Sequence, residues 1–575
     1  MAAYLHDGFL VYLDHMVDWE GYFDLRKGGG VDVDAEREAL RGVLDTCAEI
    51  CAGIEPDARA GWEESSTLAD DRVVLPKHVQ DGYDKLKEAG LVSLGVSEEY
   101  GGFDLPSLVS NMVIELVSRA DASLMTIIGL QAGVAEDIQK YASEDLKRCY
   151  LPRFASGEVM GAMDLTEPQA GSDLGGITTR ATEREGQTYL DGQKIFITNG
   201  GCEVHLVLAR DDDTFDQSKG TTRGLSLFLC PRTLESGEAN PVHVERLEHK
   251  MGLHGSPTAA IRFDNALAFR IGEKGQGFKA MLDLMNNARL GVAAQGLGIA
   301  EAALDEAIRY SRERVQFGAS IGSQPLMKNM LARMVLDVEA GRALLYRTST
   351  LIDRNSAIDA YLARDEELSD VERSELEKQK ERNGIRTRLL TPLAKYWATE
   401  ACDRVTRMAI QIHGGNGFMA ESIPGKLHLD GIITTIYEGT SEIQVSFALK
   451  EIGKGALSTV FDELRCELKE FEDGALAEPA AKVISGIERI EAITGALTAD
   501  FSYALLCARA VAEMVIIVIV GVELIRQAAA SPSRSVLAES WVNRKLLELE
   551  MHAERVAGGG VERIERCENI LSLFE

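Results

Sequence analysis

The chain is short of positive charge and of the patterns that bind metals. It has 61 Lys and Arg residues against 91 Asp and Glu residues, so its formal net charge is −30. Proteins that bind nucleic acids need clustered basic residues for phosphate contacts, so this composition argues against such a partner. The nine cysteines include no Cys-x-x-Cys pair, and the ten histidines show no His-Glu-x-x-His spacing. We therefore expect no metal, no nucleic-acid partner and a reducing, cytoplasmic location.

Long apolar runs and secretion signals are scarce as well. Residues 1–10 lack a basic segment followed by a long apolar core, which disfavours a secretory signal. An apolar run at residues 514–522 has nine residues, too few to span a bilayer. We expect a buried helix there and no integral membrane association, with a helix on a membrane surface as the alternative.

The periodicity of apolar residues changes three times along the chain. Helical spacing in the first part, as in Leu108, Met112, Val113 and Leu116, gives way near residue 161 to strand-length runs separated by Gly, Asn or Asp. Helical spacing returns near residue 277, and a charged stretch at 363–374 reads as an exposed excursion. We expect an α+β fold with four domains, namely an N-terminal helical domain (1–158), a middle β-barrel-like domain (159–272), a helical bundle (273–455) and an additional C-terminal helical domain (456–575).

A loose match to the dinucleotide-binding fingerprint occurs at Gly296 and Gly298. The fingerprint requires a preceding strand, whereas the residues on both sides here have continuous helical periodicity. We reject the match and expect these glycines to allow close packing of helices.

The most informative segment is residues 436–441, which contains Glu438 and Gly439 ahead of an amphipathic stretch. Thr440 or Ser441 is placed to be the N-cap of a helix, whose free N–H groups can bind an anion. Gly439 lets the backbone approach a ligand closely, so proton abstraction by Glu438 and anion binding could share one site. Taken alone, Glu438 would more often be an acidic turn residue.

Five motifs in a fixed order resemble the acyl-CoA dehydrogenase family. They are DLTEPQAGSD (164–173), DGQKIFITNG (191–200), RERVQFG (312–318), QIHGGNGF (411–418) and YEGT (437–440). The similar segments run from about residue 40 to 453. The N-terminal extension and the C-terminal region after residue 453 lie outside the common pattern. The extra C-terminal region and the long excursion near residue 365 resemble larger bacterial members, including those acting on methylmercaptopropionyl-CoA.

The resemblance implies FAD as the cofactor. The contacts that it implies around the isoalloxazine ring come from Thr166, Ser172, Phe196 and Thr198. The contacts that it implies to the adenosine and pyrophosphate of FAD in a neighbouring subunit come from Arg314, Phe317, Gln324, Gln411, Gly414 and Gly415. Thr440 and Glu442 also fall where the family contacts FAD, although Glu442 replaces a commonly seen glutamine. A homodimer or homotetramer is therefore expected.

The activity implied by the resemblance is α,β-dehydrogenation of an acyl-CoA thioester, a step of fatty acid metabolism. Glu438 would remove the α-proton, the β-hydrogen would leave as hydride to flavin N5, and an electron-transfer flavoprotein would receive the electrons. Substrate contacts are implied for Ser172, Asn286, Arg289 and Gly439. For Arg289, an ordinary position on a helix surface is an equally good interpretation.

Residues 427–432 depart from the family pattern. The family usually has two basic residues in this segment, where this chain has apolar ones, so we expect the turn that carries Glu438 to be held differently.

Three alternative functions stay open. An acyl-CoA oxidase would use Glu438 and FAD but pass electrons to oxygen, a second type of member would bind DNA without catalysis, and a third would be a structural protein with a vestigial flavin site.

Overall fold

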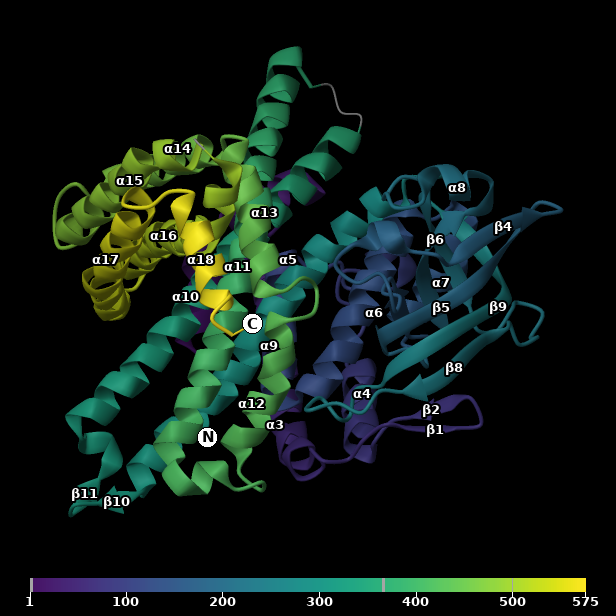
Figure 1. Ribbon diagram of the computed structural model, residues 1–575, viewed down its shortest axis with the longest axis horizontal. Coiled ribbons are helices and arrows are strands. Elements are labelled where there is room, and N and C mark those ends of the chain that lie inside the picture. The colour runs from purple at the N-terminus through teal and green to yellow at the C-terminus, as the bar shows by residue number, and fades with distance from the viewer. Residues whose placement is uncertain (1–3, 365–367, 499, 575) are drawn as a thin grey trace.

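A computed structural model describes residues 4–364, 368–498 and 500–574 of the chain. Helices form both ends of the sequence and most of its centre, while a strand barrel lies to one side of the long central helices (Figure 1). The mixed α+β architecture expected from the change in periodicity is confirmed. The four domain boundaries stay a prediction.

The N-terminal region is helical, and several of its helices begin at a residue whose side chain caps the helix. The Asp121 side chain, for example, accepts hydrogen bonds from the amides of Ser123 and Leu124 at the start of a buried helix. The elements of this region are α1 (Asp7–Val11), α2 (Trp19–Lys27), α3 (Val33–Ala60), β1 (Thr67–Ala69), β2 (Arg72–Val74), α4 (Lys77–Glu88), α5 (Ser107–Ala120), α6 (Ala122–Tyr141) and α7 (Glu144–Ala155). Strands β1 and β2 form an antiparallel hairpin.

The middle region is a closed barrel. Its strands are β3 (Gly161–Asp164), β4 (Arg180–Arg184), β5 (Gln187–Thr198), β6 (Val204–Asp211), β7 (Leu225–Pro231), β8 (Val242–Leu247) and β9 (Thr258–Ile271), with the short helix α8 (Phe215–Ser218) between β6 and β7. Pairing runs β6–β4–β5–β9–β7 and returns from β7 to β6, which closes the ring. The segments near residues 188 and 195 belong to one strand, β5, which continues through an irregularity at residues 194–197 where Phe196 has a φ of 59°.

The central bundle consists of α9 (Gly277–Glu313), α10 (Pro325–Ala363), α11 (Asp370–His413), α12 (Ile423–Ile432) and α13 (Ser441–Gly453), with the two-residue strands β10 (Val315–Gln316) and β11 (Ala319–Ser320) after α9. Gly296 and Gly298 lie within α9, as expected. A Cβ on Gly298 would come within 2.3 Å of the Glu115 carbonyl oxygen on α5, so only glycine allows this helix contact. Of the predicted excursion at 363–374, residues 365–367 lie outside the described residues.

The C-terminal region packs against the bundle and against the N-terminal helices (Figure 1). Its helices are α14 (Ala456–Leu468), α15 (Ala477–Thr498), α16 (Phe501–Ala530), α17 (Ser535–Ala557) and α18 (Glu562–Leu571). Gln527 on α16 donates to the Tyr12 hydroxyl over 2.8 Å, and Arg534 pairs with Asp7 over 2.6 Å. The two sequence extensions therefore contact each other directly.

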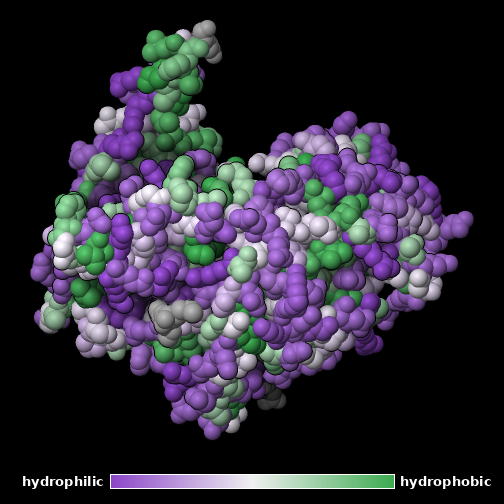
Figure 2. Space-filling view, turned by 90° about the horizontal axis from the view of Figure 1, so that it is seen from below, coloured by the Kyte–Doolittle hydropathy of each residue, from purple (hydrophilic) through white to green (hydrophobic). Residues whose placement is uncertain are grey.

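Helix α16 contains the apolar run at residues 514–522. By length and composition it is the one helix in the described ranges that could cross a membrane, yet 72% of its most apolar window is buried inside the fold. The expectation of a buried helix is confirmed. Hydrophilic residues predominate on the face of the molecule in Figure 2, in keeping with the high content of charged residues.

Candidate active site

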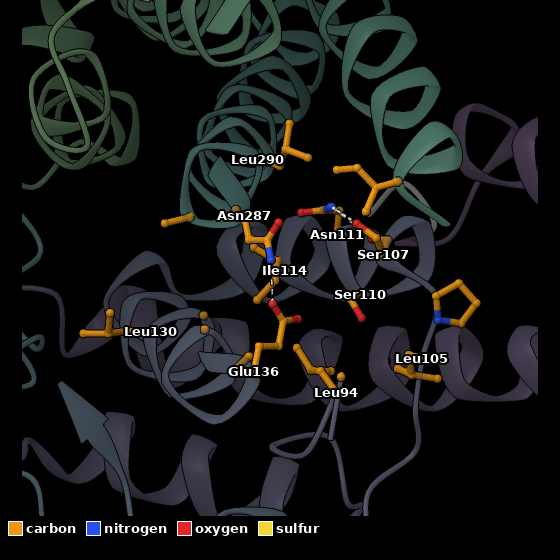
Figure 3. Close-up of a pocket in the computed structure, with 18 of the residues that line it drawn as sticks. Leu94, Leu105, Ser107, Ser110, Asn111, Ile114, Leu130, Glu136, Asn287 and Leu290 are labelled. Atoms are coloured by element: carbon orange, nitrogen blue, oxygen red, sulfur yellow. Dashed lines mark hydrogen bonds between the residues drawn. The ribbon is translucent and has the colours of Figure 1, made fainter. Parts of the chain in front are cut away.

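A cavity of about 530 Å³ lies between the N-terminal helices, the bundle and the end of strand β5. Residues of α5, α6, α9 and α10 form most of its lining, and Figure 3 labels lining residues from α5, α6 and α9 together with Leu94 and Leu105 of the loop before α5. Thr198 at the end of β5 and Glu438 in the turn before α13 also line it. The structure thus brings two residues that the sequence singled out, from segments 240 positions apart, to one cavity.

The turn that carries Glu438 has a strained backbone. Glu438 has a φ of 56° and Gly439 a φ of 95°, so both lie in the left-handed region, where a residue other than glycine is uncommon. The Gln444 side-chain amide donates to the carbonyl oxygens of Glu438 and Gly439, over 2.8 and 3.1 Å. Lys395 on α11 donates to the Gly439 carbonyl over 2.8 Å. These contacts hold the turn in a segment without the two usual basic residues.

The Glu438 carboxylate combines burial with two nearby cations. Burial raises the pKa of Glu438, while the positive charges of Arg289 and Lys395 act to lower it. Among the described residues, no hydrogen bond or ion pair reaches its carboxylate oxygens, so the group is available to a ligand. Lys395 is itself fully buried, and this burial lowers its pKa to about 7.

Arg289 on α9 is buried rather than on the surface, which makes the surface interpretation wrong. Its side chain is 5% exposed and lies over the Phe447 ring, with the guanidinium carbon 4.9 Å from the ring centre. Nη1 donates to Asn286 over 2.8 Å, whereas Nε and Nη2 have no hydrogen-bond partner in the described part of the chain. A buried guanidinium with unused donors beside Glu438 is suited to bind an oxygen atom of a ligand.

The two asparagines of α9 have different surroundings. Asn286 accepts the bond from Arg289, while Asn287 lines the cavity and donates to Glu136 over 2.8 Å. Successive residues of a helix are rotated by about 100°, so neighbours cannot share one face. The substrate contact expected of Asn286 stays a prediction, and Asn287 is the asparagine that faces the cavity.

The residues expected around the flavin ring lie on the barrel. Thr198 lines the cavity, Thr166 is half-buried, and the Thr166 carbonyl accepts from the Ile195 amide over 2.9 Å, which joins the two segments. Phe196 is 61% exposed with its backbone in the left-handed region, and Ser172 is exposed. An exposed aromatic ring beside two threonine hydroxyls fits a flat ligand with a polar edge, as FAD has.

The residues expected at the adenosine and pyrophosphate of FAD form a separate group at one end of the bundle. Arg314 and Phe317 lie at the β10–β11 hairpin, far from the barrel in Figure 1. Tyr310 stacks on His413 with a ring distance of 4.1 Å, which brings Gln411, Gly414 and Gly415 near this hairpin. Phe317 is 97% exposed, and Gln324 is the N-cap of α10. Their contact with FAD in another subunit stays a prediction.

The start of α13 differs in detail from the expected N-cap. The helix begins at Ser441 with Thr440 in the N-cap position, but the Thr440 side chain makes no capping hydrogen bond. Ser441 instead donates to Glu400 over 2.6 Å. Glu442 is exposed and pairs with Arg509 of α16 over 2.9 Å, so the C-terminal region contacts this segment.

Lys395 and Gln444 were not identified from the sequence. Gln444 lies five residues after Gly439, in the first turns of the next helix, so its spacing could have indicated a role. Lys395 is 44 positions from Gly439, and its only local signal is a cation within an apolar stretch of α11.

Models of three domains of one family match the chain. The acyl-CoA dehydrogenase N-terminal domain matches residues 45–158, the middle domain matches 162–266, and the C-terminal domain matches 275–363 and 375–453. The 3-methylmercaptopropionyl-CoA dehydrogenase of Ruegeria pomeroyi is 35% identical over 454 residues, which are 76% of this chain and 73% of that protein. An acyl-CoA dehydrogenase of Bacillus subtilis is 34% identical over 365 residues, 63% of this chain and 86% of the relative.

Solved structures of acyl-CoA dehydrogenases are also similar to this chain. The butyryl-CoA dehydrogenase of Megasphaera elsdenii has a TM-score of 0.59 and 28% identity, and the match covers 71% of this chain and 96% of that one. An acyl-CoA dehydrogenase from Bacillus anthracis, complexed with FAD, has a TM-score of 0.74 at 23% identity and covers 96% of this chain and 91% of its own. This second likeness shows that the fold extends through the C-terminal helices. The chain belongs to the acyl-CoA dehydrogenase family and is an FAD-dependent oxidoreductase that acts on acyl-CoA.

Proposed function

We propose that this protein removes one hydrogen from each of the α and β carbons of an acyl-CoA thioester to give the 2-enoyl-CoA. The α-hydrogen leaves as a proton, which the Glu438 carboxylate accepts. FAD, when bound, supplies the oxidant that takes the β-hydrogen with its electron pair. The substrate loses two electrons and two protons in total, so the reaction is balanced by the two-electron reduction of the flavin.

The observation that carries this proposal is the position of the Glu438 carboxylate. It lines the same cavity as Thr198, is free of hydrogen bonds from described residues, and lies on a turn held by Gln444 and Lys395. Burial raises its pKa, which makes it a stronger base than a carboxylate in water. A thioester carbonyl needs a positive or N–H environment as its α-proton leaves, and the Gly439 turn and the unused donors of Arg289 support such a role.

We also propose that Thr166, Ser172, Phe196 and Thr198 contact the flavin ring. Thr440 is proposed as a further FAD contact, whereas Glu442 is already engaged by Arg509 and would have to release it to contact FAD. The exposed group at the β10–β11 hairpin and the end of α11 would bind the FAD of a second subunit. This arrangement would require a homodimer or homotetramer, which sedimentation analysis of the FAD-loaded protein can test.

The electron acceptor in this proposal is an electron-transfer flavoprotein. An oxidase would differ only in passing the electrons to oxygen. Anaerobic reduction of the enzyme by an acyl-CoA, followed by admission of air, separates the two. Slow reoxidation that an electron-transfer flavoprotein accelerates is expected, and rapid reoxidation by air alone would identify an oxidase.

The decisive experiment is Glu438→Gln. The amide has nearly the shape of the carboxylate but cannot accept a proton, so we expect FAD to stay bound while turnover falls by about 10⁴-fold. Flavin absorbance measures the first property, and acyl-CoA-dependent reduction of an artificial acceptor measures the second. Glu472→Gln, at an exposed residue of the C-terminal region away from this cavity, is the matched control and should retain turnover. Substantial residual activity in Glu438→Gln would contradict the role assigned to Glu438.

A further inference from the structure

One wall of the cavity is polar, although an alkyl chain would need only apolar contacts. The residues that define this polar wall come from α5, α6, α9 and α10, and they are Ser110, Asn111, Glu136, Asn287 and Asp353. Figure 3 shows Ser110, Asn111, Glu136 and Asn287 among the leucine side chains of the lining. Polar groups on a cavity surface are unfavourable unless water or a ligand bonds to them. The polar wall therefore indicates what the occupant carries.

The amide donors of the polar wall are mostly used, and the Ser110 hydroxyl is the donor without a partner among the described residues. Asn111 Nδ2 donates to the Ser107 carbonyl over 2.9 Å and to Ser349 Oγ over 3.0 Å. Asn287 Nδ2 donates to Glu136 Oε2 over 2.8 Å. The Asn111 amide has therefore used both of its N–H groups, whereas the Asn287 amide has one N–H group left.

The acceptors of the polar wall are largely unused. Within the described residues, no hydrogen bond reaches Glu136 Oε1 or Asn111 Oδ1, and Ser110 Oγ has no partner. A Cβ added to Gly95 would lie 2.8 Å from Glu136 Oε1, so the glycine leaves this carboxylate oxygen room. A ligand that supplies a donor would satisfy these atoms.

The charges at this wall disfavour an acidic ligand. Glu136 and Asp353 are both carboxyl groups, and Asp353 accepts from the amides of Ser107 and Leu108 at the start of α5. The nearby guanidinium of Arg26 makes contacts of 2.8 and 2.6 Å with both oxygens of Asp104. A ligand carboxylate would therefore lie against two carboxyl groups, with Arg26 already bound by Asp104, although Lys140 also lines the cavity and its positive charge acts on Glu136.

We propose that the acyl groups bound by this protein carry a hydrogen-bond donor, such as a hydroxyl or amino group, that Glu136, Asn111 and Ser110 accept. This inference rests on the proposed function, because it takes the cavity as the acyl site. The N-terminal extension contributes to it, since Tyr22 and Arg26 of α2 line the same cavity. Acyl groups that end in a carboxylate are the class that the two carboxyl groups of the wall disfavour.

The test compares binding of acyl-CoA esters that differ only at the end of the acyl chain. FAD-loaded Glu438→Gln protein is titrated with methyl-ended, hydroxyl-ended, amino-ended and carboxyl-ended esters at each chain length from four to eight carbons. Heat of binding gives each Kd. At the best chain length we expect the hydroxyl or amino ester to bind at least about tenfold more tightly than its methyl counterpart, and the carboxyl ester to bind most weakly. Three results would each overturn the inference. They are methyl-ended acyl-CoA esters that bind as tightly as the hydroxyl-ended and amino-ended ones at every length, no binding of any ester, and tightest binding of the carboxyl-ended ester.

Variants of the polar wall locate the effect. Glu136→Gln keeps an acceptor for Asn287 but presents an amide N–H in place of a free carboxylate oxygen, so the preference for the amino ester should fall at least about fivefold and binding of the carboxyl ester should improve. Ser110→Ala should weaken binding of the hydroxyl-ended and amino-ended acyl-CoA esters and leave binding of the methyl-ended esters unchanged. Glu144→Gln, the same change on exposed α7, is the control. An unchanged order of binding in both wall variants would contradict the assignment.

The proposed function is read separately, from turnover by the wild type. Turnover without any preference among the esters would contradict this inference but not the proposed reaction. The expected order of binding without reduction of the flavin by any ester would contradict the proposed reaction but not this inference.

Discussion

Two walls of one cavity contain carboxyl groups, but the groups have different partners. Glu438 lies near two cations and its carboxylate receives no hydrogen bond from a described residue. Asp353, in contrast, accepts hydrogen bonds from two backbone amides, and Glu136 accepts one from the side-chain amide of Asn287. Burial raises the pKa of all three. A buried carboxyl group can therefore be held ready for a proton or be part of the framework, and its hydrogen bonds, more than its burial, distinguish the two cases.

The largest expected effect concerns Asp353, whose pKa burial raises to about 7. The folded protein binds a proton there that the unfolded chain releases above about pH 4, so the free energy of unfolding falls as the pH rises from about 4 to about 7. Asp353→Asn removes this dependence. Relative to the wild type, the variant should gain as much as about 4 kcal/mol between pH 4 and pH 8, as measured by urea unfolding. At low pH it should be less stable by about 1–3 kcal/mol, because the amide oxygen replaces only one of two acceptors for α5.

Asp430 is a matched control for Asp353. Burial also raises its pKa to about 7, and it accepts from the Leu253 amide over 2.6 Å and from Trp62 over 2.7 Å, but it is outside the acyl cavity. Asp430→Asn should change the pH dependence of stability in the same direction without changing the order in which acyl-CoA esters bind. If Asp353→Asn and Asp430→Asn changed the order in which acyl-CoA esters bind in the same way, a local role of the polar wall would be contradicted.

The second effect tests the strained turn on the other wall. Gly439 has a φ of 95°, and an added Cβ would lie 2.7 Å from Gln444 Nε2, the amide that holds the turn. Gly439→Ala should move the Glu438 carboxylate and lower kcat by about 10²-fold with FAD still bound. Gly453→Ala at the end of α13 meets no atom within 4 Å and should leave kcat unchanged. Equal kcat values for the two variants would show that the turn does not position Glu438.

The features that the sequence predicts well depend on local patterns. The change from helical to strand periodicity and the helical nature of the Gly296 segment follow from residues close together in the chain. The turn at Glu438 was also identifiable, because a glycine beside a carboxylate before a helix is a local signal.

The features that the sequence did not predict depend on packing between distant segments. The burial of Arg289, the bond from Lys395 to the Gly439 carbonyl and the contribution of Arg26 to the cavity all join residues from different helices. Even a local prediction fails where a distant partner competes. Glu400 accepts a hydrogen bond from the Ser441 hydroxyl, and the expected side-chain cap of α13 does not form.

The smallest of these effects tests whether the cations set the pKa of Glu438. Lys395→Met removes one positive charge beside it, while the Gly439 carbonyl keeps its bond from Gln444. The pKa of Glu438 should rise, and because the carboxylate must be ionised to accept a proton, the acid limb of kcat/KM should move to higher pH by about one unit, or about 1.4 kcal/mol. Lys450→Met, an exposed lysine on α13, removes the same charge without this shift. Since burial lowers the pKa of Lys395 to about 7, the wild type loses this charge above pH 7 by itself. The difference between wild type and Lys395→Met should therefore be greatest below pH 7 and shrink above it, and a difference that is constant with pH would mean that Lys395 acts by holding the turn and not by its charge.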